Sequence, residues 1–133
     1  MKRTNDHIEN IQRKIGYDFK NTDLMFQAFI RKSYSEENGG ENNEVLEFIG
    51  DKVLDLIVVK LLAEKHGEIK KAKIGNMNEL ELFVSELDEG ELTEKKRKLV
   101  EKKNLAERML DLGFSKYLIM SKGDLENDLQ YSK

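Results

Sequence analysis

The chain has 133 residues, of which 23 are basic and 26 are acidic, so its formal net charge is only -3. This length predicts one domain with a single modest core. The near balance of charge excludes a strong overall field that would attract nucleic acid or membranes, so such binding must come from local patches. The chain has no Cys, which excludes disulfides, thiolate metal sites and a cysteine nucleophile.

Two further features of the sequence concern fold class and location. Proline, which punctuates sheets and turns, is absent, and this favours a helical protein. No apolar stretch of the kind found in a secretory signal peptide follows Met1. The longest apolar runs, such as Leu56–Val59, are far too short to span a membrane. We therefore expect a soluble, cytoplasmic, all-α domain that does not contact membranes.

The first third of the chain predicts two helices. Isoleucines recur at helical spacing between Asp6 and Ile15, which predicts a first helix over this range. Thr22 is the expected N-cap of a second helix through residues 24–30. Residues 35–43 hold two glycines and three asparagines, which predicts a polar surface loop.

The middle of the chain is its most apolar segment. It predicts one long helix from Glu44 to about His66, ended by Gly67. At 1.5 Å per residue such a helix is about 33 Å long. We therefore expect it to be the central, buried element of the fold.

The second half of the chain predicts shorter helices. Residues 68–75 are basic and weakly patterned. After them, a helix is predicted from four apolar residues at helical spacing, Leu80, Phe83, Val84 and Leu87. Another helix is expected from Thr93 to Lys103, and Asn104 is the expected N-cap of a last helix that Gly113 ends.

The predicted central helix carries a stripe of four acidic residues. Their successive spacings are three, four and four residues, so at 100° per residue they fall within about 80° of the helix circumference. Like charges at these spacings repel, and they lose solvation when they are buried. Carboxylates so arranged suit a hard divalent cation such as Mg²⁺. The four residues are Glu44, Glu47, Asp51 and Asp55.

The stripe also has a simpler explanation, because it fits the solvated side of an amphipathic helix. Lys52 is the single basic residue in the acidic half of the helix, and this favours the metal site. Gly50 costs about 1 kcal/mol relative to Ala inside a helix, so it indicates that another element packs closely there. That element is either a second helix in the core, which is the simpler expectation, or a second copy at a dimer interface.

The segment from Asn43 to Leu54 reads N-E-V-L-E-F-I-G-D-K-V-L. It resembles the signature of the ribonuclease III family, N-E-x-L-E-F-L-G-D-x-x-L. Residues 88–93, D-E-G-E-L-T, are similar to the family's D-E-G-x-L-T element. Shorter matches extend the resemblance over nearly the whole chain, at Ala28-Phe29, Ser33-Tyr34, Leu105-Ala106, Leu112-Gly113, Tyr117-Leu118 and Lys122-Gly123.

The resemblance implies a fold, a partner and a reaction. The fold is the all-α ribonuclease III endonuclease domain, a helical bundle around the long buried signature helix. The partner is a second copy, because the family forms homodimers through that helix. The reaction is hydrolysis of phosphodiesters in double-stranded RNA, for which Mg²⁺, or Mn²⁺ in its place, orients and activates water.

The resemblance also implies roles for individual residues. Glu47 and Asp51 would be catalytic residues that bind the metal. Glu44 would be a third catalytic residue, which shapes the cleavage site near the dimer axis. Glu89 would be a further acid at the metal site, supplied by the opposite subunit or acting through water. Asp55 receives no role from the family.

The chain departs from the family pattern in two places. Residues 30–32 read I-R-K where the family often has a His before the Ser of its early helix. The family's second acid pair, a D-x-x-E on a later helix, does not occur after Gly123, where the chain offers Asp124, Glu126 and Asp128. We therefore expect residues 1–133 to be one endonuclease domain that is incomplete at its C-terminus. It would lack a double-stranded RNA-binding domain and cut RNA poorly.

Two basic clusters could contact RNA phosphates, and their binding would weaken with salt. The expected RNA-binding residues lie on the helix predicted from Thr93, at Lys95, Lys96, Arg97 and Lys98. The second cluster comprises Lys65, Lys70, Lys71 and Lys73. The alternative for both clusters is a solvated surface.

The sequence thus supports two functions of different classes. The first is a dimeric, Mg²⁺-dependent endoribonuclease that cuts double-stranded RNA. The second is a non-catalytic module that binds double-stranded RNA or dimerises, and that retained the signature helix but lost the second acid pair.

Overall fold

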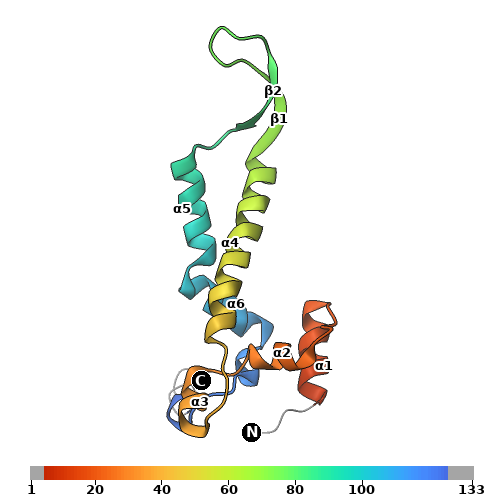
Figure 1. Ribbon diagram of the computed structural model, residues 1–133, viewed down its shortest axis with the longest axis vertical. Coiled ribbons are helices and arrows are strands. Elements are labelled where there is room, and N and C mark those ends of the chain that lie inside the picture. The colour runs from red at the N-terminus through yellow and green to blue at the C-terminus, as the bar shows by residue number, and fades with distance from the viewer. Residues whose placement is uncertain (1–4, 126–133) are drawn as a thin grey trace. The chain divides into compact units, whose positions relative to one another are not determined.

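The computed structural model describes residues 5–125 of the chain. The described residues divide into two compact units, one formed by residues 5–50 and 107–125 and the other by residues 51–106. Helices α4 (Glu44–His66) and α6 (Lys102–Leu112) pass from one unit into the other. The expected all-α class is confirmed, because most described residues are helical, with one two-stranded sheet in addition (Figure 1).

The first unit contains three short N-terminal helices, α1 (Asn5–Ile15), α2 (Thr22–Gln27) and α3 (Lys32–Asn38), and the turn η1 (Ser115–Tyr117). The N-cap of α2 is Asn21 and not Thr22, because the Asn21 side chain accepts a hydrogen bond from the backbone N–H of Leu24. Residues 35–38 of the predicted loop are helical, and Gly39, with a φ of 80°, ends α3.

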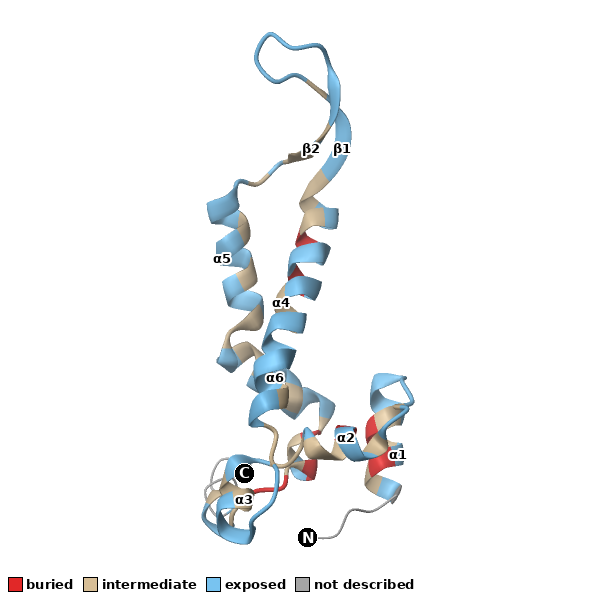
Figure 2. Cartoon of the chain, viewed as in Figure 1, coloured by how far each residue is buried: buried red, intermediate tan, exposed pale blue. Residues whose placement is uncertain are grey.

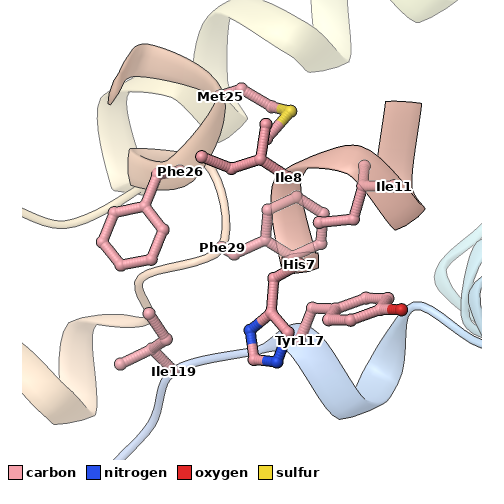
Figure 3. Close-up of a pocket in the computed structure, with 8 residues that line it drawn as sticks. All are labelled: His7, Ile8, Ile11, Met25, Phe26, Phe29, Tyr117 and Ile119. Carbon is pink, nitrogen blue, oxygen red and sulfur yellow. The ribbon is translucent and has the colours of Figure 1, made fainter. Parts of the chain in front are cut away.

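A small core holds the first unit together. It is formed by five buried side chains, Ile8, Ile11, Met25, Phe114 and Tyr117. Figure 3 shows a pocket lined by four of these side chains together with His7, Phe26, Phe29 and Ile119. Its lining is apolar except for His7 and the hydroxyl of Tyr117, and the centroids of these two rings lie 5.2 Å apart. Because no set of polar groups converges in this pocket, it is part of the core and offers no catalytic chemistry.

The second unit contains the C-terminal part of α4, the strands β1 (Gly67–Ala72) and β2 (Leu80–Ser85), and helix α5 (Glu89–Val100). The strands form an antiparallel hairpin in which Gly67 pairs with Ser85 and Ala72 with Leu80. After the hairpin, α5 runs back alongside α4 (Figure 1). An ion pair of 3.6 Å between Lys96 and Asp55 joins these two helices.

The predicted helix around Leu80 and Leu87 is wrong, because residues 80–85 are strand β2. The apolar residues of this segment fit two periods. Leu80, Leu82 and Val84 also alternate with a period of two, which is the strand pattern. Gly75, with a φ of 59° in the connecting turn, lets the chain reverse there, so the alternating pattern pairs with β1.

The boundaries of the last two helices also differ from the prediction. Helix α5 begins at Glu89 rather than Thr93, because Asp88 and Glu91 form a capping box that satisfies the first backbone N–H groups. Helix α6 begins at Lys102, and the side chain of Asn104 donates to the carbonyl of Leu99. Asn104 therefore satisfies a backbone carbonyl at the end of α5 instead of capping the start of α6.

Helix α4 has the predicted bounds but not the predicted burial within one chain. Among its described side chains only Val58 and Leu62 are buried. Figure 2 shows that most of α4 is exposed. Its large apolar side chains that are at least 49% exposed are Val45, Phe48, Ile49, Val53, Leu56, Ile57, Val59 and Leu61. A Cβ placed on Gly50 would meet no described atom within 4 Å, so the expected helix crossing in the core is wrong. In the described part of the chain no helix is long and apolar enough to cross a membrane.

Three contacts fix the hairpin to the end of α4. The backbone N–H of Glu86 donates to the carbonyl of His66 at 2.8 Å. The Glu86 carboxylate lies 2.6 Å from Nδ1 of His66, whose side chain is only 10% exposed. The ring of Phe83 packs directly over Gly67, in space that any side chain at that position would occupy. These contacts therefore attach the base of the hairpin to the C-terminal end of α4.

Substituting Gly67 tests this attachment. In Gly67→Ala the added methyl group overlaps the Phe83 ring, so we expect the free energy of unfolding to fall by about 1–3 kcal/mol, as for other overpacked sites. Urea unfolding followed by circular dichroism measures it. Gly90→Ala is the control, since a Cβ there lies 3.4 Å from the nearest atom. Equal stability of the two variants would show that Phe83 does not hold the hairpin in place.

Candidate active site

Two asparagines of the polar loop fix the start of α4. The Asn43 amide donates to the carbonyl of Ala28 at 2.9 Å. The Asn42 side chain donates to Oγ of Ser35 and accepts from the backbone N–H of Glu44, both at 2.9 Å. These bonds orient the first turn of α4, and with it the first two carboxylates of the stripe.

The carboxylates of the stripe all lie on the unbroken helix α4. Glu44 forms an ion pair of 3.6 Å with Lys32, and both side chains are just over half exposed. Asp51 contacts its neighbour Lys52 at 3.6 Å. Glu47 is exposed and has no ion-pair partner among the described residues. Water therefore solvates these three carboxylates in the single chain, and a cation can reach Glu47 and Asp51.

Asp55, the fourth member of the stripe, has a structural partner. Its carboxylate lies 3.6 Å from Nζ of Lys96, and the two side chains are only 27% and 32% exposed. This ion pair holds α5 against α4. Asp55 therefore has a structural role that the other three carboxylates lack. Lys96 is occupied by the same ion pair. The sequence carried no signal for this contact, because the two residues are far apart along the chain.

The predicted RNA-binding residues of α5 divide into two groups. Arg97 forms ion pairs with Glu94 at 2.6 Å and with Glu101 at 3.5 Å. Its hydrogen bond to Glu94 lowers the pKa of that carboxyl group. Lys95 and Lys98 are exposed, and no ion pair engages either of them within residues 5–125. Of the four basic side chains, these two are available to bind a polyanion.

Glu89 is not brought to the stripe within one chain. It is the first residue of α5 and follows the hairpin that begins where α4 ends. Asp51 lies 15 residues before His66 on α4, which corresponds to about 22 Å along the helix axis. In the described residues no group of three or more His, Asp or Glu side chains is close enough to hold a metal ion.

Of the three C-terminal acids, the structure describes Asp124. Asp124 forms an ion pair of 3.8 Å with Arg31. Glu126 and Asp128 lie outside the described residues.

Glu47 and Asp51 nonetheless fit part of a magnesium shell. They are four residues apart, so they share one face of α4 on adjacent turns. Mg²⁺ keeps several waters and is usually bound by one or two carboxylates together with phosphates of the substrate. The pair can supply those carboxylates, and the remaining ligands must come from water, RNA or other acids.

Comparison with known protein families gives an independent result. A family model described as Ribonuclease-III-like matches residues 21–132. Among curated proteins, the chain is 55% identical over 130 residues to a protein named Ribonuclease 3 from Roseburia hominis, covering 94% of this chain and 36% of that protein. It is 48% identical over 124 residues to Ribonuclease 3 of Treponema succinifaciens, covering 92% and 31%. The chain thus spans about a third of the length of these two relatives.

Two solved structures resemble this fold. Both are of the nuclease domain of ribonuclease III from Campylobacter jejuni, at 29% identity and with 91% of this chain covered. The TM-scores are 0.71 and 0.67, and the matches cover 70% and 68% of those chains. The first of these structures is described as flexible in a region involved in dimer formation.

Proposed function

Because the chain belongs to the ribonuclease III-like family, we propose that it is an endoribonuclease domain that hydrolyses double-stranded RNA with the aid of Mg²⁺. One observation carries this proposal. Glu47 and Asp51 lie on adjacent turns of an unbroken α4, exposed and not engaged by any other helix or strand of the described chain. This arrangement suits a hydrated Mg²⁺ ion that also contacts phosphates of the substrate.

The proposed roles follow from the positions on α4. Glu47 and Asp51 would hold the metal ion, which when bound would activate water and stabilise the leaving oxygen. Glu44, one turn before Glu47, extends the negative surface along the same face. The bonds of Asn42 and Asn43 keep this first turn in place while RNA binds. The free ammonium groups of Lys95 and Lys98 would contact phosphates of the RNA.

Dimerisation through α4 is part of the proposal. In the single chain, eight apolar side chains of α4 are exposed to water. Burying one such side chain fully stabilises a protein by about 1.5–3 kcal/mol. Association that covers these side chains is therefore favourable. Open space beside Gly50 lets another backbone approach closely. Homodimer formation is also consistent with the similar Campylobacter jejuni domain, which has a region involved in dimer formation. A second copy could supply Glu89, which is not brought to the stripe within one chain.

A second candidate function is a non-catalytic module that binds double-stranded RNA or dimerises. No three acidic side chains in residues 5–125 lie close enough together to hold a metal ion, and this favours the module. The two functions differ in one measurable property, because a module needs no metal at α4.

The first prediction on function concerns the metal pair. Glu47→Gln removes a charged ligand, so we expect Mn²⁺ binding, followed by electron paramagnetic resonance, to be lost. We expect cleavage of long double-stranded RNA to fall on the order of a hundredfold, as when charge stabilisation in a transition state is removed. The control is Glu64→Gln, which lies on the same helix and pairs with Lys60 at 4.0 Å. Unchanged Mn²⁺ binding in Glu47→Gln would favour the module.

The free lysines of α5 give a second prediction. The double variant Lys95→Gln, Lys98→Gln should bind double-stranded RNA more weakly. The slope of log affinity against log salt concentration should fall by about 1 for each lost phosphate contact. The control is Arg97→Gln, because Arg97 is engaged by Glu94 and Glu101. A larger change of slope in the control than in the double variant would place the RNA contact elsewhere.

Gly50 gives a third prediction, which separates stability from dimerisation. No described atom lies near its Cβ position, so Gly50→Ala should stabilise α4 of the monomer by about 1 kcal/mol through helix propensity. The same methyl group should weaken the dimer at least about tenfold if a second copy packs there. Sedimentation equilibrium and thermal unfolding measure the two effects. An unchanged dissociation constant would exclude Gly50 from the dimer interface.

A further inference from the structure

The hairpin β1–β2 has no role in the proposed reaction, yet it exposes much apolar surface. Its large apolar side chains are between 41% and 64% exposed, namely Ile69, Ile74, Met77, Leu80 and Phe83. An isolated two-stranded hairpin is at best marginally stable in water. Apolar side chains gathered on so small an element indicate a surface that another molecule covers.

The register of the hairpin defines the composition of its two faces. Ile69 pairs with Phe83, and Lys71 pairs with Glu81. Residues directly opposite each other share a face, as do residues two apart on one strand. These four side chains therefore form one face, with an apolar pair near α4 and a pair of opposite charges nearer the tip.

The charges of the hairpin favour a protein partner over RNA. From Gly67 to Ser85 the chain carries three lysines and three glutamates, so its net charge is zero. Lys70 lies 3.9 Å from Glu68, and Lys71 stands opposite Glu81. A surface that binds RNA needs an excess of positive charge, and apolar side chains gain nothing from phosphates. A neutral surface with apolar residues and both charge signs is complementary to another surface of the same kind.

The hairpin follows directly on the exposed apolar side chains at the C-terminal end of α4. It begins at the residue after His66, and the Glu86 and Phe83 contacts fix it to the helix end. Within the last turns of α4, Ile57 and Leu61 are 49% and 59% exposed. A molecule that covers α4 as far as its C-terminal end therefore also meets the hairpin.

We propose that the hairpin β1–β2 is an interaction surface for a second copy of this chain, extending the contact formed by α4. The inference rests on the proposed dimerisation through α4. In a two-fold dimer each contact occurs twice, so a short hairpin contributes two contact areas to the interface. The partner is a second copy because the hairpin is neutral, carries matched charges of both signs and continues the surface that dimerisation buries.

The first test weakens the apolar surface without touching the attachment to α4. The double variant Ile69→Ser, Met77→Ser leaves His66, Glu86 and Phe83 unchanged. Sedimentation equilibrium should show a dimer dissociation constant raised at least about tenfold. The matched control is Leu110→Ser on α6, because Leu110 is 63% exposed and Ile69 is 64% exposed. Circular dichroism at a concentration where the variants are monomeric should show that all of them are folded.

The second test detects the contact directly. Because the chain has no Cys, Met77→Cys gives one reactive thiol for a photo-crosslinker. Irradiation without RNA should give a covalent dimer. A dimeric wild type with an unchanged constant in the double variant and no crosslink would overturn the hairpin surface alone. A monomeric wild type would overturn it together with dimerisation through α4. A crosslink formed only to added double-stranded RNA would assign the hairpin to RNA instead.

Discussion

Helix α4 carries more apolar surface than the single chain covers, and the other features of the structure depend on it. Asn42 and Asn43 fix where the helix starts, and His66 with Glu86 fixes where it passes into the hairpin. Between these ends the helix is unbroken, so exposed apolar side chains and exposed carboxylates lie on one continuous element.

The distribution of charge follows from the same helix. Asp55 is drawn into an ion pair with Lys96 where α5 packs on α4, whereas Glu47 and Asp51 stay in water. The Asp55 ion pair is half-buried and joins two helices, so binding a cation there would break a structural contact, whereas the contact of Asp51 with its neighbour Lys52 is an exposed surface pair that contributes little. The stripe is therefore divided into a structural member, Asp55, and a pair that keeps its capacity for metal. The same packing leaves Lys95 and Lys98 free while it engages Lys96.

The sequence predicted α4 from Glu44 to about His66, because this is the most apolar segment of the chain and Gly67 follows it. It failed at residues 80–85, where Leu80, Phe83 and Val84 satisfy a helical spacing and Leu80, Leu82 and Val84 satisfy a strand spacing. Short apolar segments often fit both periods, and only the pairing with β1 decides between them. The local sequence pattern also could not predict the ion pair between Lys96 and Asp55, because this contact depends on how α5 returns along α4.

The disagreement over the burial of α4 has a physical explanation. An apolar pattern around a helix indicates that every side of the helix is buried from water, but it does not indicate which molecule buries it. Atoms of the same chain and atoms of a second copy bury a leucine equally well. Gly50 is ambiguous in the same way. A glycine at this position permits a close approach by a helix of the same chain, and it equally permits one by a helix of a partner. Among the described residues of the single chain no atom lies near the Cβ position of Gly50. Under the proposed dimerisation, α4 would be a core helix whose core a second copy completes.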